Sequence, residues 1–296
     1  MSPIAHLQTS TKAASIGIVL GGALWGLFWI PLRAFEDIGF EGAYPGFVFY
    51  IIALLVFLPL TLAFRTPITS KRDLALAGLL TGTAFSFYGT SIILTDVVRA
   101  LLFFYLTPIW GTAIGILFLG ERLTAARVIA ILLAFAGLFA VIGFGSRDAI
   151  NLGDLLAFTS GIFWTIGSYK IYQMKDTPAV QLCTGFLTGA IVATAALIAF
   201  GGDALRGTDP FPALAPLWPY LLATALYALP MILLTIWPPK VLTPGRIGIL
   251  LMSEVVVGFI SVALFAGDPL GPFEIIGAIL IVAATSLEIL GNKDAT

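Results

Sequence analysis

Charged residues are scarce in this sequence. Asp, Glu, Lys and Arg make up 10% of its 296 residues, while 59% are hydrophobic and the mean hydropathy is +1.04. A typical soluble domain carries roughly 25% charged residues. So few charges cannot cover a surface that faces water, and most of the surface is therefore expected to face lipid.

Cysteine and histidine are almost missing as well. Cys183 is the only cysteine and His6 the only histidine, so the sequence offers neither an intrachain disulfide nor a clustered zinc site. It also has no G-x-S-x-G nucleophile elbow and no Walker-type phosphate loop. We therefore expect no enzyme, no metal or other cofactor, and no ATPase subunit. The net charge of −1 argues against nucleic acid as a partner.

Long apolar runs take the place of these features. A spanning helix needs about 20 mostly apolar residues, and seven charge-free runs are suited to it. They are 13–32, 42–64, 74–95, 100–120, 128–146, 177–202 and 210–239. Three more apolar stretches, 153–172, 245–266 and 272–291, are interrupted by charges. Strand-like alternation is absent, so the sequence predicts an all-α integral membrane protein with ten transmembrane helices.

Lys and Arg are unevenly distributed between the two sides of this arrangement. With residues 1–12 as a cytoplasmic tail, 11 of the 15 Lys and Arg residues fall on the cytoplasmic side. Four fall on the other side: Arg33, Arg99, Arg147 and Arg206. This bias obeys the positive-inside rule. We expect a multi-pass protein of the inner (plasma) membrane with both termini in the cytoplasm.

Two weak internal matches predict a duplicated architecture. Arg99–Ala130 matches Arg246–Gly277 at an offset of 147, and Gly22–Trp25 matches Gly161–Trp164 at an offset of 139. The chain is then two five-helix repeats, 13–150 and 151–296. Five is odd, so the second repeat enters the membrane from the opposite side, as in inverted-repeat transporters. We expect the halves to rock about a central cavity lined by helices 1, 3, 4, 6, 8 and 9.

Short motifs in both halves carry a family resemblance. Tyr105–Pro108 followed by Gly120–Thr124 resembles the Thr-Pro and Gly-Glu-x-Leu-Thr signature of the drug/metabolite transporter superfamily, and Trp25-Gly26 resembles its Trp-Gly. Within that superfamily the chain is similar to the EamA-type exporters and to the aromatic amino-acid exporter branch. The resemblance implies a ten-helix basket with a central cavity that exports amino acids or related metabolites. The chain departs from the pattern at Val255, where the family has proline, and at Asp268, where it has glutamate.

Glu254 is the foremost candidate for the substrate site. It lies nine residues into a helix that starts near Gly245, which is about 13 Å at 1.5 Å per residue and close to the midplane. An acidic group at that depth is costly and normally faces a cavity or a partner. It is either a site for a proton or a substrate ammonium, or a structural hydrogen bond between helices. The 147 offset makes Thr107 its equivalent, and Tyr105 lies close by in the sequence.

Several aromatic residues fall inside spans instead of at the interfacial belts where Trp and Tyr usually gather. They are Trp25, Tyr88, Trp164 and Tyr169. Their polar edges need partners, so they either line the cavity or pack against neighbouring helices.

Three further residues have open roles. Lys170 either snorkels to water from the end of its helix or meets a substrate carboxylate. Pro108 and Pro230 each remove a backbone hydrogen bond within a span, and we consider them either hinges or packing elements.

These features favour a secondary transporter that works by alternating access. The expected substrate is a small neutral or zwitterionic metabolite, above all an amino acid with an aromatic or apolar side chain, because no Lys or Arg lies at the midplane to hold a polyanion. A channel-like facilitator and a transporter of another metabolite or drug class are the alternatives. The other expected partner is the lipid bilayer, with the protein as a monomer or a weak homodimer.

Overall fold

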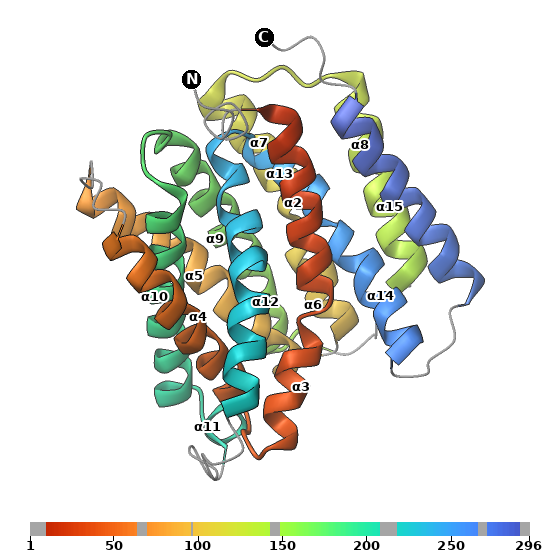
Figure 1. Ribbon diagram of the computed structural model, residues 1–296. Helices are drawn as coiled ribbons and strands as arrows, with labels where there is room; N and C mark the ends of the chain where they lie inside the picture. The colour runs from red at the N-terminus through yellow and green to blue at the C-terminus, as the bar shows by residue number, and fades with distance from the viewer. Residues whose placement is uncertain are drawn as a thin grey trace.

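The computed structural model describes residues 10–63, 70–95, 97–142, 149–207, 218–265 and 271–290, and every regular element in these ranges is a helix (Figure 1). The first half contains α2 (Thr11–Gly26), α3 (Trp29–Asp37), α4 (Tyr44–Ala63), α5 (Lys71–Leu94), α6 (Val97–Phe104), α7 (Thr107–Leu119) and α8 (Ala125–Ile142). The second contains α9 (Leu152–Gln173), α10 (Ala179–Phe200), α11 (Asp203–Arg206), α12 (Trp218–Ile236), η2 (Pro238–Lys240), α13 (Pro244–Leu251), α14 (Ser253–Phe265) and α15 (Pro272–Leu290). Of the tail expected at residues 1–12, residues 1–9, with His6, lie outside the described ranges, and Thr11 and Lys12 belong to α2.

Seven helical segments are long and apolar enough to cross a bilayer. They are Thr11–Asp37, Tyr44–Ala63, Lys71–Leu94, Arg99–Leu119, Ala179–Phe200, Pro219–Lys240 and Pro244–Phe265. The helices α8, α9 and α15 lie where the sequence predicts three more spans but are not among the seven. An all-helical chain with many candidate spans is therefore confirmed for the described residues, whereas the count of ten remains a prediction.

The surface of the bundle carries large apolar side chains. Leu117, Phe200 and Leu264 are 75%, 90% and 72% exposed. Such a surface is unfavourable in water, where burying apolar area is the main driving force of folding, but it suits contact with acyl chains.

Three of the long segments are interrupted near their middle. The chain breaks at Leu27–Phe28 between α2 and α3, at Tyr105–Leu106 between α6 and α7, and at Met252 between α13 and α14. The second break lies just before Pro108, which was expected to be either a hinge or a packing element and which occupies the first turn of α7. The third forms although Val255 replaces the family's proline. There, Ser253 donates its hydroxyl to the carbonyl oxygen of Val19 at 2.8 Å, so a contact with α2 supports the break.

Glycines bring α5 and α10 into backbone contact. Gly78 and Gly82 on α5 face Gly185 and Gly189 on α10, each pair with the spacing G-x-x-x-G. A Cβ added to Gly82 would lie 2.2 Å from the backbone nitrogen of Ala190, and one added to Gly189 would lie 2.1 Å from the carbonyl oxygen of Gly78. Small residues at this spacing allow membrane helices to approach closely, so this contact has no room for side chains.

The two ends of the bundle differ in what they contain (Figure 1). The start of α2 and the end of α15 lie at one end, together with the starts of α8 and α13. We call this the terminal end. The end of α3 and the short helix α11 lie at the opposite end, which we call the α3 end.

Candidate functional site

Glu254 is buried in the interior of the bundle, with 6% of the residue exposed. It is the second residue of α14, immediately after the break at Met252. The Tyr88 hydroxyl on α5 donates to its Oε1 at 3.0 Å, and the Tyr105 hydroxyl in the α6–α7 turn donates to its Oε2 at 2.6 Å. No Lys or Arg of the described ranges forms an ion pair with it. The carboxyl group is thus held by two neutral donors from other helices.

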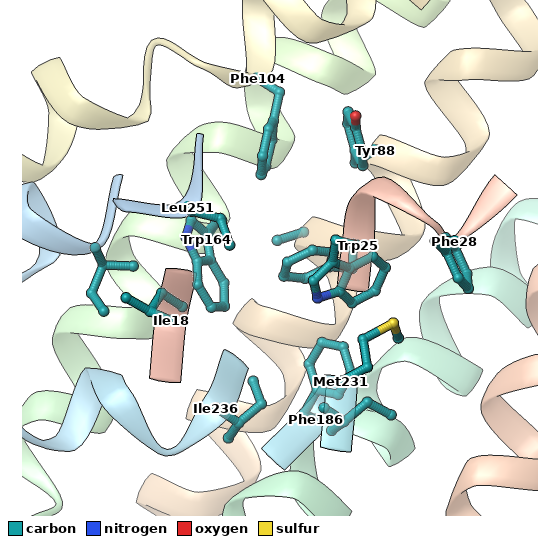
Figure 2. Close-up of a cluster of buried hydrophobic side chains, with 14 of the residues drawn as sticks. Ile18, Trp25, Phe28, Tyr88, Phe104, Trp164, Phe186, Met231, Ile236 and Leu251 are labelled. Carbon is teal, nitrogen blue, oxygen red and sulfur yellow. The ribbon is translucent and has the colours of Figure 1, made fainter. Parts of the chain in front are cut away.

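A cluster of aromatic rings adjoins this carboxyl group through Tyr88 and Tyr105. Figure 2 shows Trp25 in the middle of the cluster, between Trp164 and Phe28. Trp25 stacks on Phe85, with ring centroids 4.2 Å apart, and Trp164 meets the same Phe85 edge-on at 5.0 Å. Tyr88 packs on Phe104 at 4.5 Å. The predicted residues Trp25, Tyr88, Tyr105 and Trp164 therefore belong to one assembly.

Two predicted residues of this assembly have polar atoms that no described residue satisfies. The hydroxyl of Thr107 and the indole nitrogen of Trp164 are buried without a hydrogen-bond partner, and so is the hydroxyl of Ser160, one turn before Trp164 on α9. A Cβ on the intervening Gly161 would lie 2.8 Å from the carbonyl oxygen of Phe104, so this face of α9 lies against the α6–α7 break. Buried polar groups nearly always have a partner, and a polar ligand is a suitable one.

By contrast, Tyr169 and Lys170 lie away from Glu254. The Tyr169 hydroxyl accepts a hydrogen bond from Gln173 at an exposed position, and Lys170 Nζ pairs with Asp73 Oδ1 at 2.8 Å. Asp73 is in the first turn of α5, 15 residues before Tyr88, which is about 22 Å along a helix. The geometry favours the snorkelling interpretation of Lys170 over a contact with a substrate carboxylate at Glu254.

The two predicted hinge prolines have different surroundings. Pro108 follows the α6–α7 break directly, and a Cβ on Gly248 of α13 would lie 2.8 Å from its nitrogen. Pro230 lies inside α12, which continues through it from Trp218 to Ile236. Pro108 thus lies at an interruption, whereas Pro230 does not; a hinge function stays a prediction for both.

A buried charge cluster at the terminal end was not predicted from the sequence. Arg127 Nη1 lies 2.8 Å from Glu121 Oε2, and its Nη2 lies 3.1 Å from Glu288 Oε1. The Arg127 and Glu288 side chains are 8% and 3% exposed. Arg246 is buried within electrostatic range of all three, and its Nε has no hydrogen-bond partner among the described residues. The cluster joins the α7–α8 loop to α8 and α15.

The α3 end has a smaller buried ion pair. Arg99 on α6 pairs with Asp154 in the first turn of α9, and the two side chains are 9% and 1% exposed. Asp154 Oδ1 also accepts a hydrogen bond from the Thr95 hydroxyl at 2.8 Å. This pair joins the start of α6 to the start of α9.

A cavity of about 240 Å³ lies between α3, α4, α5 and α10. Its inner part is formed by Phe28, Tyr50 and Phe85, which are 9%, 3% and 1% exposed. Its rim at the α3 end carries the exposed residues Arg33 and Glu36. Because Phe28 and Phe85 also contact Trp25, the cavity adjoins the aromatic cluster beside Glu254.

The described ranges contain no group of three or more His, Cys, Asp or Glu residues arranged to hold a metal ion. Around Glu254 the available groups are its carboxyl group, hydroxyl and indole donors, and aromatic surface. These groups are suited to non-covalent recognition of a small molecule.

The fold is that of a multi-pass helical membrane protein, and a buried carboxyl group with aromatic rings lies in its core. Residues 12–143 match the model of the EamA-like transporter family. A solved structure titled "Crystal structure of protein" is similar in fold, with a TM-score of 0.72 at 19% identity, and the match covers 95% of this chain and 99% of that one. No curated protein matches the sequence.

The family match over residues 12–143 supports the resemblance to the drug/metabolite transporter superfamily, and the solved structure shows a likeness of fold alone. The aromatic amino-acid exporter branch stays a prediction.

Proposed function

We propose that this protein is a secondary transporter that exports a small zwitterionic or neutral metabolite, with Glu254 at its central substrate site. The observation that carries the proposal is the buried Glu254 carboxyl group, which receives hydrogen bonds from Tyr88 and Tyr105 beside two helix breaks. Ionisable residues inside a membrane are rare and mark substrate or proton paths. Interrupted helices at the midplane are a common way of building such sites in transporters.

The pattern of helix contacts supports an inverted repeat of 13–150 and 151–296. In such a repeat α5 corresponds to α12, and α2 and α4 correspond to α9 and α10. The α5–α9 contact then has its counterpart in α12–α2, and the α5–α10 contact in α12–α4. All four of these helix pairs are in contact. The helices α7 and α13, and α8 and α15, pair directly with their own counterparts. The interrupted segments match in length: α6 and α13 have 8 residues each, and α7 and α14 have 13 each.

The orientation follows from the charge bias and is open to a labelling test. In a Cys183→Ala background, we expect Asp37→Cys at the α3 end to react with a membrane-impermeant maleimide in intact cells. Arg72→Cys, at the start of α5, should react only after permeabilisation, because that end faces the cytoplasm. Both positions are exposed in the fold, so reagent access is limited by the membrane alone. The reverse pattern of labelling would contradict the proposed topology.

The substrate class rests on the chemistry around Glu254. A carboxylate without a protein cation attracts an ammonium group. Trp25, Phe85 and Trp164 offer apolar ring surface in the cluster that includes its partner Tyr88. A polyanion would need several Arg or Lys residues beside it. No Arg or Lys of the described ranges forms an ion pair with Glu254. An amino acid with an aromatic or apolar side chain fits both properties.

Transport by a carrier is tested by counterflow in proteoliposomes. We expect unlabelled L-phenylalanine inside the vesicles to accelerate uptake of labelled L-phenylalanine several-fold over empty vesicles, because a carrier returns faster when it is loaded. A channel-like facilitator would show no such acceleration. Loading with a sugar phosphate provides the matched control. Strong counterflow of the sugar phosphate, with none for any amino acid in a labelled panel, would refute the substrate class.

A further inference from the structure

The rim of the 240 Å³ cavity has two opposite charges that are not used within the protein. Arg33 and Glu36 are three residues apart on α3, a spacing at which side chains can pair. Neither side chain forms an ion pair or a hydrogen bond with any residue in the described ranges. Both residues are exposed, and both line the cavity.

Below the rim the cavity is largely apolar. Phe28, Tyr50 and Phe85 form its inner part. Two hydroxyls of the wall are already used, since Ser86 Oγ donates to the carbonyl oxygen of Ala190 at 2.9 Å and lies 2.8 Å from Thr194 Oγ1. The cavity therefore offers a cation and an anion at its mouth and ring surface inside. Pockets for drug-sized ligands measure about 300–1,000 Å³, so a cavity of 240 Å³ suits a smaller molecule.

We propose that this cavity is a second binding site, at the α3 end, that selects zwitterions with an apolar side chain. Arg33 binds the carboxylate, Glu36 binds the ammonium group, and the side chain enters the aromatic interior. The proposal rests on the transport function proposed above and adds a recognition step to it. Glu254 offers a charged partner for the ammonium group alone, whereas Arg33 offers a cation to the carboxylate.

The connection between the two sites passes through aromatic rings. Phe28 and Phe85 line the cavity, and both contact Trp25, with ring centroids 4.9 and 4.2 Å apart. Phe85 is also 6.2 Å from Phe104, the ring that packs on Tyr88. A zwitterion that passes between Glu254 and the cavity must displace these rings. During export the outer site thus receives the zwitterion after Glu254 and recognises both of its charges before release.

The test compares three ligands that differ only in their charges. L-Phenylalanine carries both groups, phenethylamine lacks the carboxylate, and 3-phenylpropionate lacks the ammonium group. Binding to the purified full-length protein in nanodiscs is measured by calorimetry for wild type, Arg33→Gln and Glu36→Gln. We expect Arg33→Gln to weaken phenylalanine binding about five- to tenfold and leave phenethylamine unchanged. Glu36→Gln should weaken phenylalanine by a similar factor and leave 3-phenylpropionate unchanged.

Asp37→Asn is the matched control, because Asp37 is an exposed acid on the same helix that does not line the cavity. It should bind all three ligands like wild type. Unchanged ligand preference in both Arg33→Gln and Glu36→Gln, in a protein whose counterflow is intact, would overturn the outer site and leave the transport function standing. Absence of both binding and counterflow for every amino acid in wild type would instead overturn the transport proposal, and the outer site with it.

Discussion

Replacing Glu254 with glutamine is expected to remove most transport while leaving the fold intact. Glutamine has nearly the same size and can still hydrogen bond to the hydroxyls of Tyr88 and Tyr105, which now donate to the carboxyl oxygens at 3.0 and 2.6 Å. It cannot carry a negative charge or exchange a proton. Counterflow of the Gln variant should therefore fall strongly, and whatever rate remains should no longer depend on pH. The measurement is the rate across a pH series, in vesicles with equal amounts of inserted protein.

Alanine at the same position separates binding from coupling. Glu254→Ala deletes the charge-assisted hydrogen bond to a substrate ammonium, which contributes about 1.5–3 kcal/mol, so affinity should fall roughly 10- to 150-fold. Tyr88→Phe and Tyr105→Phe are the matched controls, because each removes one donor to the carboxyl group and keeps its charge. A Gln variant with the wild-type rate and pH profile would make Glu254 a packing element between helices and remove it from the transport cycle.

The second large effect is expected at the buried charge cluster of the terminal end. Arg127→Met leaves Glu288, whose side chain is 3% exposed, without its Arg127 partner. Removing one member of a buried ion pair typically costs about 3–5 kcal/mol, because the other charge stays buried. We expect a clear loss of thermal stability in detergent and a lower yield of folded protein. Arg122→Met is the control, since Arg122 is an exposed arginine of the same loop.

A charge-balanced double variant shows whether burial of unmatched charge is the cause. Arg127, Arg246, Glu121 and Glu288 sum to zero, and Arg127→Met with Glu121→Gln again leaves one cation and one anion. We expect this double variant to recover part of the stability lost by Arg127→Met, which would appear as a coupling energy in the double-mutant cycle. A single variant as stable as the Arg122→Met control would show that the cluster contributes little to stability.

The sequence predicted the depth of the candidate residues better than the direction in which they point. Trp164 and Tyr169 both lie inside one apolar span, but five residues correspond to about 140° around a helix with 3.6 residues per turn. Trp164 therefore faces the aromatic cluster, while Tyr169 bonds to Gln173 at an exposed position. Depth follows from counting residues along a span, whereas the buried face is set by which helices pack against it.

Other features of the fold were missed for one of two reasons. Either their residues are distant in the sequence, or their residues are common throughout a sequence of this composition. Arg127 and Glu288 are 161 positions apart, so only the fold brings them together. The G-x-x-x-G spacings at Gly78 and Gly82, and at Gly185 and Gly189, are visible in the sequence, but the spacing alone does not show which helix each of them contacts. Breaks near Pro108 could be predicted because proline removes a backbone donor. The break at Met252 could not, because it depends on a contact with α2.

The backbone contact between α5 and α10 bears on which parts can move. The helix α5 belongs to the first half of the chain and α10 to the second, yet their glycines leave no side-chain layer that could deform between them. Tilting one half against the other would shear this contact, because closely packed interiors resist continuous deformation. If the protein works by the proposed alternating access, α5 and α10 should therefore move together. A moving block would then contain helices from both halves, and its boundary would differ from the boundary of the proposed repeat, about which the halves were expected to rock.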